Sequence, residues 1–413
     1  MSVHNFYSDE GEELVSERIK SYFDAAPLFK WGGQLGSGAN GIVYKVFNQV
    51  DGKIRTFAVK IAPIDVDLGG NKSWGEDDEP VPDEVQSLES EKLWLSRLRN
   101  CPHIIKSVDL PYDPLSQSFE NIIPHRMRSW IFMEYAENGS LQTFVDRHLE
   151  RYNGEVMPNR LLWRLFMCLI RGCLDMAYYN AQLDGKPVDL NTVDFNALSS
   201  IEPGDLAHRD LGSHNIVLGP TEIDQTPEHF LTPILKIIDF GEAYLIDPET
   251  DRYGRTGSQR NVRDICRIMV YILLHDLKFF KEITITIWGE TFKTEGSAVY
   301  EHHNEFLQEG VDEELLYLLY KGTSPDKDVT PDLVELARYV HERIMIRGDR
   351  GEERETDKAI KERVFSLIYD ADTRPKKRGR DDDEMDIDMD TDMNEGETKR
   401  RRLDDDGDED CRK

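Results

Sequence analysis

Short runs in which apolar and polar positions alternate occupy the chain from Phe29 onward. The runs FKWGGQLGSGANGIVYKVFNQ and IRTFAVKIA, separated by Asp51 and Gly52, predict antiparallel strands joined by a tight turn. RSWIFMEYA at 128–136 predicts another buried strand, and an acidic loop is expected over 65–83. An amphipathic helix is predicted before that strand. Its apolar positions are Leu88, Trp94, Leu95 and Leu98.

Beyond Gly139 the apolar spacing becomes helical. A buried helix is predicted after Pro158, and two strand-like runs, NIVLG and ILKIIDF, follow a polar insert at about 181–205. The apolar stripe of that helix comprises Leu162, Leu165, Phe166, Leu169 and Cys173. Further helices are predicted at 261–277, 312–320, 331–346 and 356–369. Because strands dominate the first part and helices the second, the predicted class is α+β with two lobes.

Composition divides the chain into three segments. Residues 1–28 form a polar extension with one helix near 12–26, and residues 29–375 form the folded domain, with lobes at about 29–136 and 137–375. Residues 376–413 hold sixteen acidic and ten basic side chains and almost no apolar ones. Such a tail cannot bury enough apolar surface to fold alone, so we expect it to be disordered.

The charge and cysteine content exclude several classes of protein. Fifty-one basic against eighty acidic residues give a net charge of −29, which argues against a broad nucleic-acid or anionic-membrane binder. The five cysteines form no CxxC pair, which disfavours a disulfide scaffold and a structural zinc motif. The start of the chain is acidic, and no run of about 20 apolar residues is present. We therefore expect an intracellular protein without membrane or nucleic-acid partners.

A glycine-rich loop between the first two predicted strands is a candidate phosphate site. Glycines let the backbone N–H groups approach phosphate oxygens closely, although a bare glycine hairpin has the same pattern. Lys60 in FAVKIA is costly to bury unless phosphate or a carboxylate pairs with it. The loop comprises Gly36, Ser37, Gly38, Ala39, Asn40 and Gly41, followed by Ile42 and Val43.

A second cluster, HRDLGSHN at 208–215, precedes Asp239-Phe240-Gly241. A carboxylate that accepts a hydroxyl proton, together with an amide and a second carboxylate on a hard cation, is what phosphoryl transfer requires. Each of these residues alone would more often cap a helix or form a turn.

Taken in order, GxGxxGxV, AVK, a helix glutamate, MEY, HRDxxxxN and DFG resemble the eukaryotic protein kinase domain over about 29–375. The resemblance implies ATP and Mg²⁺ as cofactors and a protein substrate. It implies that Asp210 is the catalytic base, that Arg209 supports it, and that Lys60 contacts the phosphates and pairs with Glu91, or less favourably with Glu89. Asn215 and Asp239 would be the Mg²⁺ ligands. The remaining ATP-site positions implied are Leu35, the glycine loop, Val43, Ala58, Met133, the hinge from Glu134 to Ala136, and Val217.

Several positions depart from the kinase pattern. Gly212 stands where serine/threonine kinases place a lysine, which removes a charge and leaves the preferred hydroxyl open, with Ser/Thr favoured over Tyr. The segment from Gly241 to Asp264 is short and lacks a clear APE. Asp264 is expected to steady the catalytic loop. These departures and the insertions at 65–83, 181–205 and 219–233 resemble divergent kinases of filamentous fungi.

Two alternatives to an active protein kinase remain open: a kinase-fold nucleotide-binding scaffold with weak catalysis, and a small-molecule phosphotransferase. Basic blocks at 374–380 and 399–402 predict nuclear import through an import receptor, whereas charge that merely solvates the tail is the alternative. Cys168 and Cys173 are interpreted as core residues, and His302 and His303 as surface residues.

Overall fold

The computed structural model describes residues 9–38, 40–50, 52–62, 81, 83–119, 129–183, 185–190, 192–220, 228–275 and 280–369. The chain divides into two compact units, Met1–Asp372 and Thr373–Lys413, and all described residues belong to the first. Ala39, most of the loop expected at 65–83 and the tail with its basic blocks lie outside the described residues.

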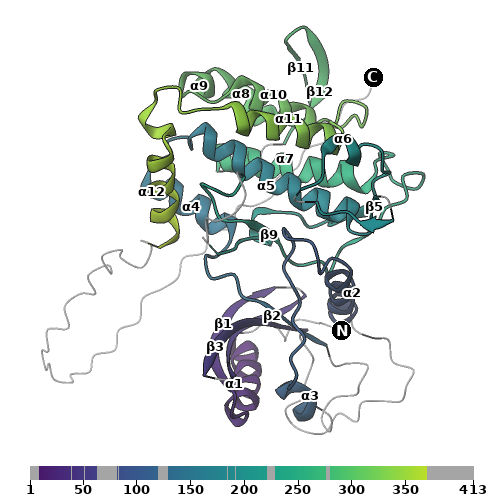
Figure 1. The fold of residues 1–413 in the computed structure, drawn as a ribbon, viewed down its shortest axis with the longest axis vertical. Coiled ribbons are helices and arrows are strands. Elements are labelled where there is room, and N and C mark those ends of the chain that lie inside the picture. Colours follow the sequence, from purple (N-terminus) through teal and green to yellow (C-terminus); the bar gives the residue numbers. More distant parts are fainter. Residues whose placement is uncertain are drawn as a thin grey trace, which may run out of the picture. The chain divides into compact units, whose positions relative to one another are not determined.

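One antiparallel sheet of four strands occupies the first part of the chain, in the order β1-β2-β3-β4 (Figure 1). The strands are β1 (Phe29–Gly38), β2 (Gly41–Val50), β3 (Lys53–Ile61) and β4 (Trp130–Glu134). Val50 of β2 lies opposite Lys53 of β3, and Gly52 between them has a φ of +73°. Both agree with the predicted tight turn, although Asp51 itself lies outside the described residues. Backbone bonds from Val108 N to Phe132 O and from Glu134 N to Lys106 O extend the pairing beyond β4.

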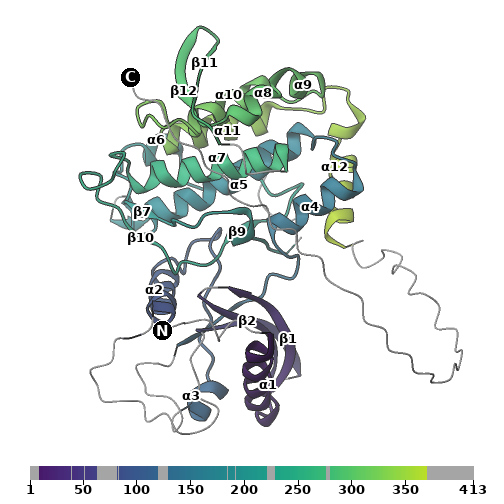
Figure 2. The same ribbon diagram turned by 180° about the vertical axis from the view of Figure 1, so that it is seen from behind.

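Helix α1 (Asp9–Ala25) packs on the sheet, as both ribbon views show (Figures 1 and 2). Its buried Ile19 and Phe23 share a hydrophobic core with Tyr44, Val59 and Phe132 of the strands. The helix predicted in the polar extension therefore contributes apolar surface to the core of the sheet.

Helix α2 (Asp83–Arg97) is the amphipathic helix predicted from the sequence, and α3 (Pro114–Phe119) is a short addition. The predicted apolar positions Leu88, Trp94 and Leu95 are buried. The same face also buries Glu91, whose side chain is only 1% exposed. A carboxylate so deeply buried requires a partner.

The remaining described helices form the second part of the fold, and α5 and α7 lie side by side near its centre (Figure 2). The predicted helices are found as α5 (Asn159–Tyr178), α7 (Gly257–Leu274), α10 (Glu313–Gly322), α11 (Leu333–Ile346) and α12 (Asp357–Ile368), preceded by α4 (Leu141–Arg151). Helix α5 is buried on nearly every side, as expected of a helix that is apolar around most of its circumference. The predicted α+β class is confirmed, and no helix among the described residues is long and apolar enough to cross a bilayer.

Short elements complete the second part. Strands β8 (Ile216–Leu218) and β9 (Leu235–Ile237) pair antiparallel and correspond to the two predicted strand-like runs. The 181–205 insert holds β5 (Gln182–Leu183), β6 (Lys186–Pro187) and α6 (Phe195–Leu198). Strands β7 (Leu206–Ala207) and β10 (Tyr244–Leu245) pair with each other. The hairpin of β11 (Ile283–Ile287) and β12 (Glu290–Thr294) projects past the helices (Figure 1), and α8 (Ser297–Glu301) and α9 (His303–Gln308) follow it.

Candidate active site

Lys60 joins three elements that are distant in sequence. Its Nζ lies 2.7 Å from Glu91 Oε2 of α2 and 2.7 Å from Asp239 Oδ1, just after β9. Glu89 instead binds Lys92 and Ser129, so Glu91 is the glutamate that pairs with the strand lysine. Burial alone would lower the pKa of Lys60, but the charges of Glu91 and Asp239 raise it above its ordinary value. Lys60 is therefore held as a cation.

The loop at 210–215 is closed by hydrogen bonds within itself. Asn215 Nδ2 donates to Asp210 O (2.8 Å) and to Asp210 Oδ2 (3.0 Å), which fixes the carboxylate against the amide. Ile238 N donates to Asn215 O (3.0 Å), which brings Asp239 next to the loop. The amide nitrogen of Asn215 is thus engaged in these hydrogen bonds, and its Oδ1 is the atom that could ligate a cation. The structure brings together Lys60, Glu91, Asp210, Asn215 and Asp239.

Asp239 and Arg209, the residue before Asp210, have left-handed backbone conformations. Arg209 has a φ of +69° and Asp239 a φ of +65°. Residues other than glycine adopt this conformation only at an energetic cost, and such residues concentrate at functional sites. Four described residues elsewhere, Asn153, His275, Trp288 and Arg350, also have a positive φ, so the two angles agree with the side-chain geometry without locating the site by themselves.

The residue that holds the loop from α7 is Asn261. Its Oδ1 accepts from His208 N (3.1 Å), and its Nδ2 donates to Leu206 O (2.8 Å). Asp264 lies one helical turn further along α7 and lines a small cavity together with Gly212 and Ser213 of the loop, so its expected role in steadying the loop stays a prediction. The sequence alone does not single out Asn261, because Asn261 and Asp264 stand three residues apart on one helix face.

The burial of Asp264 can be tested through the pH dependence of the free energy of unfolding. Burial raises its pKa to about 6 from 3.8, although nearby arginines oppose the shift. The native state then binds more protons than the unfolded state between about pH 4 and pH 6, so this group's contribution to stability falls as pH rises through that window. Asp264→Asn removes the dependence. Relative to wild type, we expect the variant to gain about 1 kcal/mol of unfolding free energy between pH 5 and pH 7.5, measured by urea unfolding. A difference that does not change with pH would contradict the shift.

The glycine loop connects β1 and β2. Gly41 has a φ of +150°, and a Cβ there would meet Ile61 O at 2.8 Å, so the backbone conformation and the close approach both require glycine. Leu35 is exposed, as are Gly36, Ser37 and Gly38 at the end of β1. Asn40 is partly buried.

The expected adenine-contacting residues lie on adjacent strands. Ala58 pairs with Met133 in the β3–β4 register, and both are buried. Val43, opposite Lys60, is half-buried, as are Val217 of β8 and the hinge residues from Glu134 to Ala136. Glu134 N already donates to Lys106 O (2.9 Å), so this amide is engaged in the sheet, which leaves Tyr135 and Ala136 as the available hinge positions.

The departure at Gly212 has a local structural counterpart. A Cβ at Gly212 would meet the His214 ring at Cε1 (2.6 Å) and Nδ1 (2.8 Å). The His214 imidazole thus occupies the space beside the loop that a side chain at 212 would need. Its Nε2 lies 3.8 Å from Asp210 Oδ2, so an imidazole stands next to the candidate base.

The segment after Asp239 forms hydrogen bonds with α2 and with β7. Trp94 Nε1 of α2 donates to Ala243 O (2.9 Å), and β10 pairs with β7. The Arg209 guanidinium lies 3.8 Å from Glu242 Oε2 and 4.6 Å from the centre of the Tyr244 ring. Arg209 therefore contacts the start of the segment through charge and through an aromatic face.

No protein-family model matches the chain, and no curated protein matches it.

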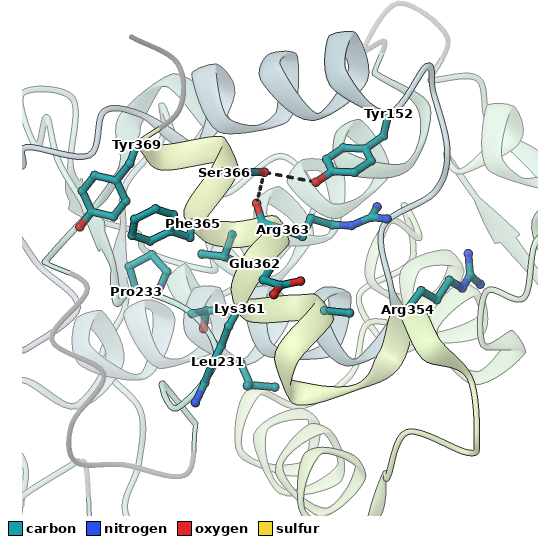
Figure 3. Close-up of a pocket in the computed structure, with 13 residues that line it drawn as sticks. Tyr152, Leu231, Pro233, Arg354, Lys361, Glu362, Arg363, Phe365, Ser366 and Tyr369 are labelled. Atoms are coloured by element: carbon teal, nitrogen blue, oxygen red, sulfur yellow. Dashed lines mark hydrogen bonds between the residues drawn. The ribbon is translucent and has the colours of Figure 1, made fainter. Parts of the chain in front are cut away.

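A separate hollow lies away from this site. It measures about 770 Å³ and is lined by α12 together with Tyr152, Leu231 and Pro233 (Figure 3). Ser366 and Tyr152 share a hydrogen bond of 3.2 Å at its rim. None of its lining residues belongs to the predicted site.

Proposed function

We propose that this chain is an ATP- and Mg²⁺-dependent protein kinase with a bilobal kinase-like fold, which transfers the γ-phosphate to a serine or threonine hydroxyl. The observation that carries the proposal is the bridge from Lys60 to both Glu91 and Asp239, at 2.7 Å each. A buried lysine between two carboxylates, one of them partly exposed, forms a charged site that phosphate oxygens could share.

The donor set around Asp239 suits Mg²⁺. A carboxylate and the Asn215 amide oxygen are hard oxygen ligands, and the Ile238–Asn215 backbone bond holds the two residues side by side. When bound, Mg²⁺ would supply positive charge to the β/γ-phosphate oxygens. Lys60 would hold phosphate oxygens through its ammonium group.

Asp210 is the proposed base. Its Oδ2 accepts from Asn215, which orients the carboxylate, and its side chain is more than half exposed and so accessible to an acceptor hydroxyl. The hydroxyl proton would pass to Asp210 as the oxygen attacks the γ-phosphorus and ADP leaves. His214, beside Asp210, would contribute a hydrogen-bond donor where the lysine is absent.

The acceptor class is tested by supplying purified protein and labelled ATP with a mixed peptide library and with small alcohols. The proposal predicts Mg²⁺-dependent label on peptide hydroxyls that is lost in Asp210→Asn. Label on alcohols alone would favour a small-molecule phosphotransferase. Bound nucleotide without transfer, with both Mg²⁺ and Mn²⁺, would favour the scaffold.

The contacts of Arg209 lead us to expect activity without phosphorylation of the segment after Asp239. A phosphate there ordinarily orders a mobile loop through the arginine, but Glu242 and Tyr244 already contact Arg209. The double variant Thr250→Ala/Tyr253→Phe should keep activity within about threefold. Thr256 is left unchanged because its Oγ1 accepts from Gln259 N (3.2 Å) and caps α7. A much larger loss that a phosphomimetic restores would contradict this expectation, with activity measured by the peptide assay.

We also propose nuclear import through the tail. Residues 370–413 fused to a fluorescent carrier should concentrate it in the nucleus. Neutralising Lys376, Lys377, Arg378 and residues 399–402 should abolish the accumulation. A fusion that remains cytoplasmic would contradict the proposal.

A further inference from the structure

Three side chains with metal-binding atoms, His103, Cys168 and His229, lie close together next to β9. Cys168 lies in α5, His103 follows α2, and His229 precedes β9. Cys168 Sγ is 3.3 Å from His103 Nδ1 and 3.9 Å from His229 Nδ1, and the three ligand atoms all lie within 4.8 Å of one another. His103 and Cys168 are buried, and His229 is half-buried.

The spacing matches a tetrahedral zinc site. Zn–S bonds of about 2.3 Å and Zn–N bonds of about 2.0–2.1 Å give an S···N edge of about 3.5 Å in a tetrahedron. The two observed S···N distances, 3.3 and 3.9 Å, lie on either side of that value. Small rotations of the imidazoles would therefore suffice to bring the three donors onto one ion.

We propose that His103, Cys168 and His229 form a structural site for a thiophilic transition-metal ion, with Zn²⁺ as the occupant. One thiolate and two imidazoles are ligands that Zn²⁺ favours, whereas Mg²⁺ prefers oxygen. Leu235 O, 3.1 Å from His103 Nδ1 and 3.9 Å from Cys168 Sγ, lies beside the fourth position, which this carbonyl or a water would fill.

The surroundings suit ligands of this kind. Leu235 N donates to Cys168 Sγ (3.0 Å), a bond that stabilises a thiolate. On binding, the Cys168 S–H bond gives way to an S–Zn bond and the proton passes to solvent.

Hydrogen bonds and an ion pair hold the backbone at two of the three proposed ligands. The Asp175 carboxylate of α5 accepts from His103 N (2.8 Å), and Ile237 N donates to His103 O (2.8 Å). His229 follows Glu228, whose carboxylate forms a buried ion pair with Arg171 of α5. A preorganised site of this kind loses little side-chain freedom on binding.

The site would stabilise the strand that carries the candidate active site. Strand β9 ends at Ile237, two residues before Asp239, and pairs with both β8 and the segment after His103. An ion bound by Cys168 of α5, His103 and His229 would link α5 to the chain segments on either side of β9 in space and so hold this strand in place. The metal would act on folding and on the placement of Asp239 rather than on the chemistry.

The test uses full-length protein, stripped with a chelator and titrated with Co²⁺ and then Zn²⁺. We expect one Co²⁺ per chain, with visible tetrahedral bands and a thiolate-to-cobalt charge-transfer band that Zn²⁺ abolishes and excess Mg²⁺ leaves unchanged. Zn²⁺ should also raise the melting temperature. Cys168→Ser should remove the charge-transfer band and weaken binding by more than the 10–100-fold typical of losing an outer-shell partner.

The matched control is Cys173→Ser, which alters another buried cysteine five positions along α5 and should keep all the bands. His229→Asn, at the less buried ligand, provides a second test if Cys168→Ser fails to fold. Absence of stoichiometric Co²⁺ binding by wild type, or bands that persist in Cys168→Ser or His229→Asn, would show that the cluster is only a hydrogen-bonded part of the core.

Discussion

Replacing Lys60 with methionine is expected to abolish MgATP binding and to lower the free energy of unfolding by about 3–5 kcal/mol. The Glu91 side chain is 1% exposed and would lose its cationic partner, while methionine keeps the length of the apolar stem. An unpaired buried carboxylate destabilises the fold by far more free energy than a surface ion pair contributes. Urea unfolding and calorimetric titration with MgATP measure the two effects.

The matched control is Lys92→Met on α2, whose partner Glu89 is 54% exposed, so that loss of this pair leaves no buried charge. That change should alter stability by less than about 1 kcal/mol and leave nucleotide binding intact. Equal stability of the two variants would mean that Lys60 is not the buried partner of Glu91.

Asp210→Asn is expected to lower the rate of phosphoryl transfer by about 10²–10⁴-fold, the usual contribution of a general base. Because asparagine nearly matches aspartate in shape, the contact with Asn215 can persist and MgATP affinity should change little. Asp328→Asn, at an exposed loop position, serves as the control and should retain wild-type activity. Turnover by Asp210→Asn that equals wild type would remove Asp210 from the role of base.

Much of the local structure could be predicted from the sequence. The strand alternation around Lys60 and the stripe of Leu88, Trp94 and Leu95 predict β3 and α2, and the same helical phase places Glu91 on the buried face. Local periodicity determines these features, so a single sequence contains them.

Features that depend on tertiary contacts were not predictable. Asp264 and Asn261 share a helix face, and only packing decides which of them reaches His208 N. Cys168 is a core residue, as predicted, but its contact with His103 and His229 was not predictable because these two lie more than sixty positions away on either side and form no motif with it. The β11–β12 hairpin was missed although its strands alternate as ITITI and ETFKT, because such short runs do not stand out between predicted helices.

Calorimetric titration of the purified protein with ATP, with and without Mg²⁺, tests most directly whether the Lys60–Glu91–Asp239 cluster is a nucleotide site. We predict one MgATP per chain, with affinity that depends on Mg²⁺, is clearly weakened in Asp239→Asn and is retained in Asp210→Asn. Absence of binding by wild type, or the same Mg²⁺-dependent affinity in wild type and Asp239→Asn, would contradict the account.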